Sequence, residues 1–484
     1  MVQDPLEKDA MAEILIRGAY HVATLDPQGT RHSGVDLLLA GGRIQDLGPD
    51  LETRHPQRAG VERQILDGSR SVVLPGLVNT HHHLFQSLQR AIPAVQDAKL
   101  FDWLVGLYPI WRWLTPEAVY WSTLLGGAEL LLTGCTTTSD HHYLFPRDAP
   151  SDLLDAQFEA AQRLGIRVHA TRGSMSLGRS AGGLPPDEVV QNEDEILKDC
   201  ERVLDRWHDP APFAMRRVAL APCAPFNVSL DLMRDTIMMA RRRGVRAHTH
   251  LGETEDENRY CLERYGKRPL QLMEDLEWLG PDVWYAHGVC FTPEEMDVLA
   301  RTGTGIAHCP TSNMRLASGI PPIPEMLRRG VPVGLGVDGS ASNDSSNMLA
   351  EVRQAMLLAR VGFGPNAMRA EDALRLATMG GAALLGRTSE LGSLEIGKAA
   401  DVILVDVSGI DRAGALADPL AAVVFTGIGQ RVHASIVNGE IVVRDGKLVR
   451  IDEAEIARHA HALSFEMLRR AGFHLPFGAP PWLV

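Results

Sequence analysis

Short apolar runs separated by glycine- and proline-containing turns occupy both ends of the chain. They lie at 14–16, 35–39, 44–47, 400–405, 434–437 and 441–443. Such runs are typical of short β-strands, and Asn438-Gly439 between the last two is a strong hairpin signal. We therefore expect the two ends, residues 1–74 and 387–450, to meet in one composite β-sandwich domain.

Between these ends, apolar runs alternate with helical stripes. The expected strands are 72–80, 136–139, 166–170, 218–221, 245–248, 283–286, 305–307 and 331–337. This alternation over about 300 residues predicts an α/β fold, a parallel (β/α)8 barrel of the TIM type at 75–386. An open doubly wound sheet is the structural competitor, but no Gly-x-Gly-x-x-Gly motif opens a βα unit.

The final segment, residues 451–484, is expected to form a helical tail. Residues Glu453 to Arg470 carry an amphipathic pattern with helical spacing. The sequence leaves open whether this helix packs on its own barrel or on a partner subunit. We expect a homo-oligomer, a dimer or larger.

Composition narrows the class of protein. The 484 residues carry a net charge of −13, which disfavours nucleic acid as a partner because a polyanion needs a basic face. Six scattered cysteines without a Cys-x-x-Cys pair indicate free thiols in a reducing compartment. No signal-peptide pattern opens the chain, and no apolar run approaches the ~20 residues that span a bilayer. We therefore expect a cytoplasmic protein that does not enter membranes.

Polar residues follow the predicted strands with unusual regularity. They are His81 and His83, Asp140 to His142, Thr171 and Arg172, Cys223, His248 to Glu253, His287, His308 and Asp338. Each one alone has an ordinary interpretation as a polar strand end or a buried, hydrogen-bonded side chain. Catalytic groups gather at the carboxyl ends of the strands in a parallel barrel, so the regular pattern predicts an active site there.

Three consecutive histidines end the first of these strands. Because side chains alternate along a strand, His81 and His83 point the same way and His82 the other way. Two converging imidazoles are half of a metal site, and nitrogen and oxygen ligands suit Zn²⁺ or Fe²⁺. Glu253, three residues after His250, can point into the same pocket and move a proton, or stabilise a helix N-terminus.

Several motifs together resemble the amidohydrolase superfamily. They are residues 75–83 (Pro-Gly-Leu-Val-Asn-Thr-His-His-His), His250-x-x-Glu253, His287, Val337-Asp338-Gly339 and, in the returning segment, Gly397-Lys-Ala-Ala-Asp401. The resemblance implies one divalent metal per chain, Zn²⁺ or Fe²⁺, held by His81, His83, His250 and Asp338. It also implies Glu253 as proton shuttle, His287 as a residue that orients the substrate, and Asp338 as the base.

One absence refines the resemblance. Binuclear members of the superfamily bridge two metals with a carbamylated lysine near the end of the fourth strand, and residues 218–226 contain no lysine. The chain is therefore similar to the mononuclear branch, the cytosine, guanine and adenosine-type deaminases, which hydrolyse C–N bonds of cyclic amidines. In that branch a hydroxide on the metal attacks the amidine carbon, the glutamate protonates a ring nitrogen and ammonia leaves.

Less generic stretches resemble the 8-oxoguanine deaminases. These stretches are 82–86, 141–146, 171–176, 182–186, 221–226 and 336–348. The resemblance implies conversion of 8-oxoguanine and water to urate and ammonia. The hydroxy-s-triazine (hydroxyatrazine-type) aminohydrolases and the isoxanthopterin deaminases are similar in the same segments, and guanine is a further alternative substrate. Hydrolysis of an alkylamine from a triazine, opening of a cyclic amide, and a non-catalytic barrel scaffold are the other hypotheses.

A planar heterocycle needs polar groups at its edge and apolar groups at its faces. Our candidates are Gln86, Arg172 and Cys223 for the edge and Trp103, Trp111 and Tyr143 for the apolar surround. Arg172 has an equally good interpretation as an ion pair at the barrel end. The tryptophans can equally be packing residues of the core or of a lid.

Overall fold

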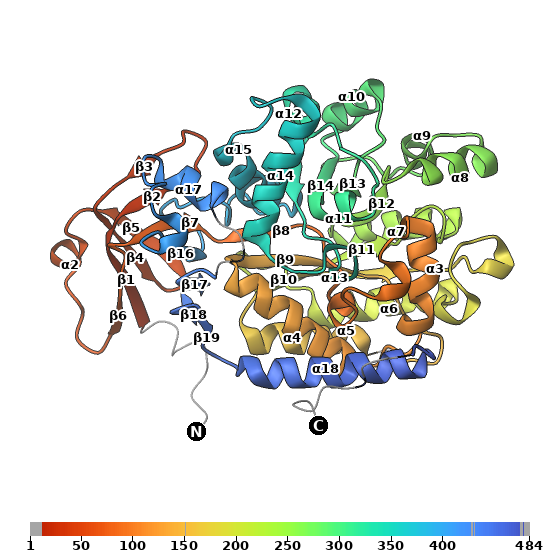
Figure 1. The fold of residues 1–484 in the computed structure, drawn as a ribbon, viewed down its shortest axis with the longest axis horizontal. Helices are drawn as coiled ribbons and strands as arrows, with labels where there is room; N and C mark the ends of the chain where they lie inside the picture. The colour runs from red at the N-terminus through yellow and green to blue at the C-terminus, as the bar shows by residue number, and fades with distance from the viewer. Residues whose placement is uncertain (1–11, 151, 427–428, 430, 475–477, 479–484) are drawn as a thin grey trace.

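A parallel β-barrel and a smaller β-domain lie side by side (Figure 1). The structure, a computed structural model, describes residues 12–150, 152–426, 429, 431–474 and 478. Residues 1–11 of the predicted β-sandwich domain and residues 475–477 and 479–484 of the predicted tail lie outside these ranges. Within them, no helix is long and apolar enough to cross a membrane.

The barrel closes in the order β10-β11-β12-β13-β14-β15-β8-β9, with every neighbouring pair parallel. Its strands are β8 (Leu77–Asn79), β9 (Cys135–His142), β10 (Arg167–Ser174), β11 (Arg216–Pro222), β12 (Ala247–Leu251), β13 (Val283–His287), β14 (Gly305–His308) and β15 (Val333–Leu335). The predicted (β/α)8 barrel is confirmed. β9 and β10 extend further than predicted, so residues 140–142 and 171–172 lie inside strands and not after them.

Helices between the strands form the outer layer of the barrel. They include α3 (Leu100–Trp111), α4 (Pro116–Leu132), α5 (Leu153–Leu164), α6 (Glu193–Trp207), α7 (Leu230–Arg243), α8 (Glu255–Tyr265), α9 (Pro269–Asp275), α10 (Pro293–Thr302), α11 (Pro310–Arg315), α12 (Ile323–Arg329), α13 (Ser340–Asn343), α14 (Met348–Phe363), α15 (Ala370–Arg375) and α16 (Gly381–Leu384). Their apolar stripes pack on the strands and on each other, which buries one large hydrophobic core.

The stretch predicted as one strand over 72–80 is in fact two. β7 (Ser71–Pro75) belongs to the small domain, and β8 begins the barrel after Gly76. A Cβ atom at Gly76 would lie 2.1 Å from the Thr136 hydroxyl oxygen, so only glycine lets the chain pass this close to β9. The transition between the domains therefore depends on a tertiary contact that an apolar run does not reveal.

The small domain contains two sheets, ordered β5-β4-β1-β6 and β19-β18-β17-β16-β7-β2-β3. Its strands are β1 (Ala12–Ala19), β2 (His21–Ala23), β3 (Arg31–His32), β4 (Val35–Ala40), β5 (Arg43–Gly48), β6 (Glu62–Asp67), β7, β16 (Val402–Asp406), β17 (Ala434–Val437), β18 (Glu440–Arg444) and β19 (Lys447–Leu448). The predicted hairpin at Asn438-Gly439 joins β17 and β18. β7 pairs with β16, and Ile14, Leu37, Val402 and Ile436 share one core.

The two ends of the chain thus form mixed sheets together, as predicted. The exact boundaries 1–74, 75–386, 387–450 and 451–484 stay a prediction. The tail helix α18 (Glu453–Arg470) has the predicted limits and packs on its own barrel below α4 (Figure 1). The His459 ring stacks on Trp121 of α4 with centroids 3.8 Å apart. Homo-oligomer formation stays a prediction.

A buried ion pair joins the two domains. Arg167 at the start of β10 contacts Asp401 through Nη2–Oδ1 (2.9 Å) and Nε–Oδ2 (3.2 Å), and both side chains are buried.

Removing one partner leaves an uncompensated buried charge, so we expect Arg167→Met to lower the free energy of unfolding by about 3–5 kcal/mol. The exposed pair Arg163–Glu455 offers a matched control, and Arg163→Met should cost about 0–1 kcal/mol. Thermal unfolding midpoints of the two variants compare these costs, and equal shifts would contradict the expectation.

Candidate active site and metal centre

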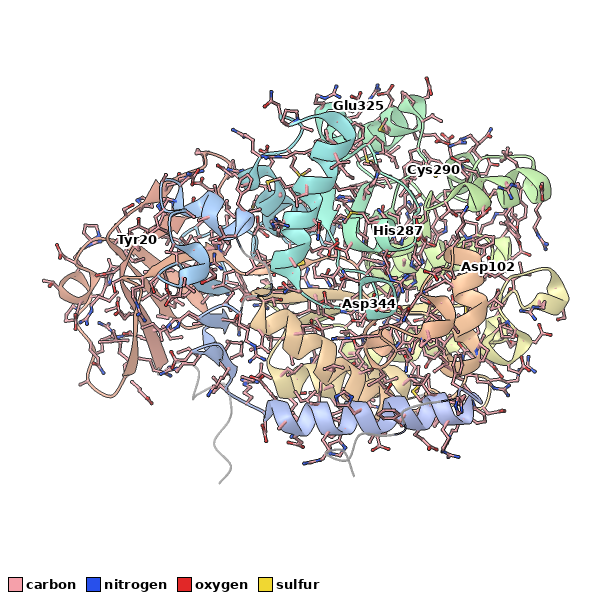
Figure 2. All side chains as sticks on the ribbon, viewed as in Figure 1. Tyr20, Asp102, His287, Cys290, Glu325 and Asp344 are labelled. Carbon is pink, nitrogen blue, oxygen red and sulfur yellow. The ribbon has the colours of Figure 1, made fainter. Side chains whose placement is uncertain are left out.

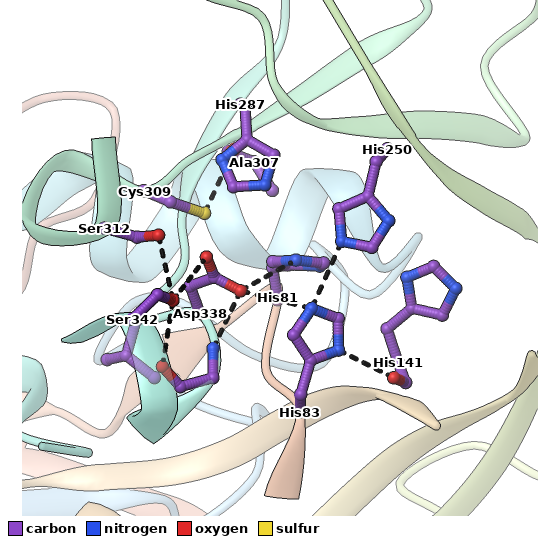
Figure 3. Close-up of polar contacts among 12 residues, drawn as sticks. His81, His83, His141, His250, His287, Ala307, Cys309, Ser312, Asp338 and Ser342 are labelled. Carbon is purple, nitrogen blue, oxygen red and sulfur yellow. Dashed lines mark hydrogen bonds and ion pairs between the residues drawn. The ribbon is translucent and has the colours of Figure 1, made fainter. Parts of the chain in front are cut away.

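Four side chains converge at the C-terminal end of the barrel (Figure 3). His81 and His83 follow β8, His250 lies in β12 and Asp338 follows β15, and all four are buried. Asp338 Oδ1 lies 3.3 Å from His81 Nε2 and 3.2 Å from His83 Nε2. His83 Nε2 lies 3.1 Å from His250 Nε2. The structure therefore brings together the residues that the resemblance implied as ligands. His82 points the other way, as alternation predicts, and its Nε2 contacts Ser346 Oγ at 2.9 Å.

Hydrogen bonds on the far side of two of these rings fix their tautomers. His83 Nδ1 donates to the backbone oxygen of His141 at 2.7 Å. His250 Nδ1 donates to the backbone oxygen of Cys223, also at 2.7 Å. Because a carbonyl oxygen only accepts, both Nδ1 atoms carry the proton and both Nε2 atoms keep a lone pair. Those lone pairs are directed at the centre of the cluster.

A second histidine, His248, fixes the His81 ring in the same tautomer, with the proton on Nδ1. His248 Nδ1 donates to the backbone oxygen of Trp284 at 2.8 Å, so His248 Nε2 is an acceptor. His81 Nδ1 lies 2.8 Å from that Nε2 and donates to it. The His81 Nε2 lone pair is therefore also free to face the cluster. His248 is one of the polar strand-end residues in the sequence, but its contact with His81 depends on packing across the barrel.

This arrangement of lone pairs fits a divalent cation. His83 Nε2 and His250 Nε2 face each other with no proton to share, and His81 Nε2 is buried with no hydrogen-bond donor among the described residues. Buried acceptors without a donor are costly unless a cation binds them. Three neutral imidazoles and one carboxylate form a donor set typical of Zn²⁺. His141, which the sequence did not mark as a ligand, also has an atom within 4.8 Å of the other three histidines' ligand atoms.

We expect His248→Phe to lower Zn²⁺ affinity about 10–100-fold, because the His81 ring loses the acceptor that fixes its tautomer. Competition with a coloured chelator measures this affinity without reference to turnover. His248→Gln keeps an amide oxygen that can accept from His81 and should restore part of the affinity. Unchanged affinity in His248→Phe would contradict the role assigned to His248.

Glu253 and His287 face this cluster from neighbouring strand ends. Glu253 Oε2 lies 3.5 Å from His287 Nε2, and Glu253 Oε1 is buried with no partner in the described ranges. Burial, reinforced by the nearby Asp338 carboxylate, raises the pKa of Glu253 to about 8. The Glu253 carboxyl therefore holds a proton at neutral pH that it can donate into the cavity.

Asn313 of α11 fixes the His287 ring. His287 Nδ1 donates to Asn313 Oδ1 at 3.0 Å, which leaves Nε2 as an acceptor on the side of Glu253. His287 and Asp338 both have left-handed backbone conformations, with φ of 76° and 64°. Such conformations are uncommon outside glycine and cluster at functional sites. We find no sequence signal for Asn313. Figure 2 shows His287 inside the barrel domain, away from Tyr20 in the small domain.

A cavity opens beside the cluster. Its wall combines polar and apolar groups: His83, Gln86, Leu100, Trp103, Leu104, Tyr143, Cys223, Phe226, Asn227, His250, Glu253, His287, Leu316, Asp338 and Ser342. Gln86 Nε2 donates to the Tyr143 hydroxyl at 3.3 Å, while Gln86 Oε1 is buried without a partner in the part of the chain described. Burial raises the pKa of the Cys223 thiol, which stays protonated. Gln86, Tyr143, Cys223 and Trp103 thus all line this cavity, and their contact with a substrate stays a prediction.

Two predicted substrate contacts lie elsewhere. Arg172 faces the outer helices because side chains alternate along β10. Its Nε contacts Asp199 of α6 at 2.7 Å and its Nη2 donates to Gln191 at 2.9 Å. The prediction that Arg172 contacts the substrate edge is therefore wrong, and the alternative of an ion pair is right. Trp111 is fully buried and packs edge-on against Phe85, as a core residue.

Comparison with known proteins agrees with this geometry. The amidohydrolase family profile matches residues 72–442. The 8-oxoguanine deaminase of Pseudomonas aeruginosa is 49% identical over 430 residues, 88% of this chain and 94% of that protein. Hydroxydechloroatrazine ethylaminohydrolase of Pseudomonas sp. (strain ADP) is 40% identical over 93% of this chain and 95% of that protein. Atrazine chlorohydrolase of Arthrobacter aurescens TC1, solved with zinc, has a TM-score of 0.88 and 36% identity, covering 93% of this chain and 100% of that one.

These matches and the site show that the chain belongs to the amidohydrolase family, as a metal-dependent aminohydrolase of the deaminase type.

Proposed function

We propose that this protein is a Zn²⁺-dependent deaminase that converts 8-oxoguanine and water to urate and ammonia. The observation that carries the proposal is the 49% identity to an 8-oxoguanine deaminase over nearly the whole of both chains. The cavity supports it, because polar groups of Gln86, Tyr143 and Cys223 face a space walled by Trp103 and other apolar side chains. A planar, aminated oxo-purine needs this combination of polar edge and apolar face.

His81, His83, His250 and Asp338 would hold the metal. A bound divalent cation supplies activation of water, because it lowers the water's pKa toward neutrality. Asp338 is suited to accept the proton from that water. Burial alone would raise the pKa of Asp338, but the neighbouring imidazoles of His81 and His83 hold it well below its usual range. The Asp338 carboxylate is therefore ionised and able to act as a base.

Glu253 delivers a proton to the substrate. Its protonated carboxyl donates to the ring nitrogen of the amidine as water oxygen adds to the adjacent carbon. The C–N bond to the exocyclic amino group then breaks, and that nitrogen leaves as ammonia with the proton that Asp338 took from the water. The carbon keeps the water oxygen as a carbonyl, and the proton lost from that oxygen returns to Glu253. His287, held by Asn313, presents an acceptor beside Glu253 that can accept from an N–H group of the substrate and so orient the ring.

A second candidate is the release of an alkylamine from a hydroxy-s-triazine. The 40% identity to hydroxydechloroatrazine ethylaminohydrolase favours it. The two activities use the same metal centre and the same proton transfers, and they differ in the amine that leaves. Identifying the released amine, ammonia or an alkylamine, therefore distinguishes the two activities. The metal ligands are the same for both and cannot distinguish them.

Ammonia release from a panel of substrates tests the proposal. The panel is 8-oxoguanine, guanine, isoxanthopterin, cytosine, isocytosine and a hydroxy-s-triazine, assayed with metal content measured on the same preparation. We expect 8-oxoguanine to have a kcat/KM at least about tenfold above the others, with urate as product. Metal at one per chain with turnover only of the triazine or the pterin would overturn the substrate and keep the reaction class.

A further inference from the structure

The opposite end of the barrel, its N-terminal floor, contains a cluster of buried and partly buried arginines. Arg167, Arg217 and Arg246 lie at the starts of the consecutive strands β10, β11 and β12, and Arg387 follows α16, which closes the floor. An apolar layer formed by Val78, Ala219, Trp284, Ala307, Leu384 and Leu385 lies in the barrel interior. This floor cluster is therefore distinct from the metal centre at the carboxyl ends of the strands.

The floor cluster carries more positive than negative charge. Asp401 pairs with Arg167, and Glu390 is shared by Arg217 (Nη2–Oε1, 3.0 Å) and Arg387 (Nε–Oε2, 2.9 Å). Arg246 has no carboxylate of its own in the described ranges, since the nearby Asp282 accepts from Arg241 at 3.0 Å. Four guanidinium groups thus face two carboxylates within the cluster, and the third nearby carboxylate, Asp282, is shared with Arg241. Buried charge of one sign is costly without a counter-charge.

Several N–H groups of this cluster also have nothing to bind. Arg217 Nε, Arg246 Nε and Arg387 Nη1 are buried with no hydrogen-bond partner among the described residues, and so is His169 Nδ1. Arg387 and His169 are almost completely buried. Such unsatisfied groups are rare in folded proteins, and an unseen ion or water is their usual explanation.

The side chains that carry these unsatisfied N–H groups lie next to one another in the barrel floor. His169 and Arg217 are direct neighbours across the β10–β11 pairing. Arg217 and Arg387 meet on the same Glu390 carboxylate. The Arg246 guanidinium lies against Gly386, where a Cβ atom would come within 2.6 Å of Arg246 Nη1, and Gly386 directly precedes Arg387. Burial, with neighbouring arginines adding to it, lowers the pKa of both Arg246 and Arg387 to about 10, so both stay charged at neutral pH.

We propose that the barrel floor binds a small inorganic anion, held by Arg217, Arg246 and Arg387 beside His169. Guanidinium N–H groups are strong donors to halide and oxyanion ligands. The side chain of Arg217 is 15% exposed, which gives the ion a route from solvent. The anion would tie β11 to β12, two strands that pair at the single position Leu220–Ala247. This site is independent of the proposed function.

Thermal unfolding at constant ionic strength tests the proposal. Chloride, or inorganic phosphate in a second series, replaces gluconate from 1 to 100 mM in the full-length protein. We expect the unfolding midpoint to rise by about 2–4 °C across the series, because a ligand of the folded state stabilises it by mass action. A rise with chloride alone indicates a monatomic site, and a rise with phosphate indicates one that takes an oxyanion.

Variants assign the effect to this cluster. Arg387→Met removes the fully buried guanidinium and should abolish the rise, while Arg234→Met, at an exposed position of α7, should keep it. No rise in the wild-type protein, or an equal rise in Arg387→Met, would overturn the proposal and leave water as the occupant. If Arg387→Met does not fold, crystals of the wild-type protein soaked in bromide decide. An anomalous peak within hydrogen-bond distance of Arg387 Nη1 supports the site, and its absence overturns it.

Discussion

Replacing His81 with alanine is expected to abolish metal binding and to reduce ammonia release to background. His81 supplies one of three Nε2 lone pairs that face the centre of the cluster, and it lies 3.3 Å from the Asp338 carboxylate. His81→Ala removes one of the four donors of this set and leaves a gap in a buried ligand shell, which weakens metal binding and disturbs the position open to water. We expect a loss of at least about a thousandfold in kcat/KM, because both the metal and its activation of water are lost. Elemental analysis and the ammonia assay on one preparation measure both effects.

The same histidine triplet provides the control. His82 points away from the cluster toward Ser346, so His82→Gln should retain one metal per chain and most of the activity. Circular dichroism establishes that both variants are folded. A folded His81→Ala protein with normal metal content and normal turnover would show that this histidine is not a ligand.

Glu253→Gln produces the second large effect, a loss of about 10²–10⁴-fold in kcat with the metal retained. The glutamine has nearly the shape of the glutamic acid but cannot deliver the acid proton to the ring nitrogen. Glu253 is not positioned as a ligand, so the metal content should remain at the wild-type value. This combination distinguishes proton transfer from metal binding, since His81→Ala loses both.

Glu255→Gln is the matched control for Glu253. Glu255 lies two residues later, in the first turn of α8, and it is exposed. It therefore shares the position near a helix N-terminus without facing the cavity. We expect wild-type kcat in Glu255→Gln. Equal losses in the two variants would indicate that Glu253 acts by stabilising the helix and not by moving a proton.

The sequence predicts the fold correctly wherever an element is defined by the pattern of apolar and polar residues within its own segment. Strand and helix patterns alternate along the middle of the chain, and a hairpin signal at Asn438-Gly439 marks one returning strand pair. The division of 72–80 into β7 and β8 is not accessible, because it depends on the contact between Gly76 and Thr136 across two strands. Local apolar character is the same in both strands, so it cannot show that they belong to different sheets.

The residues of the site likewise fall into those that local sequence spacing predicts and those that only long-range contacts reveal. His81 and His83 share a side of the chain by simple alternation, and their position at a strand end is enough to suggest a metal site. The prediction for Arg172 is wrong because a strand residue can face the barrel interior or the outer helices, and its sequence position fits both. The contacts of His248 with His81 and of Asn313 with His287 join segments far apart in the chain. Spacing cannot reveal such pairs.

Zinc addition to chelator-treated protein, with ammonia release from 8-oxoguanine as the readout, tests the central claim most directly. The geometry of His81, His83, His250 and Asp338 predicts that activity is absent without metal. It also predicts that activity rises in proportion to added Zn²⁺ and reaches a plateau at one equivalent per chain. Turnover that persists in metal-free protein, or that is absent from protein holding one Zn²⁺ per chain with every heterocycle of the panel, would contradict a zinc-dependent deaminase.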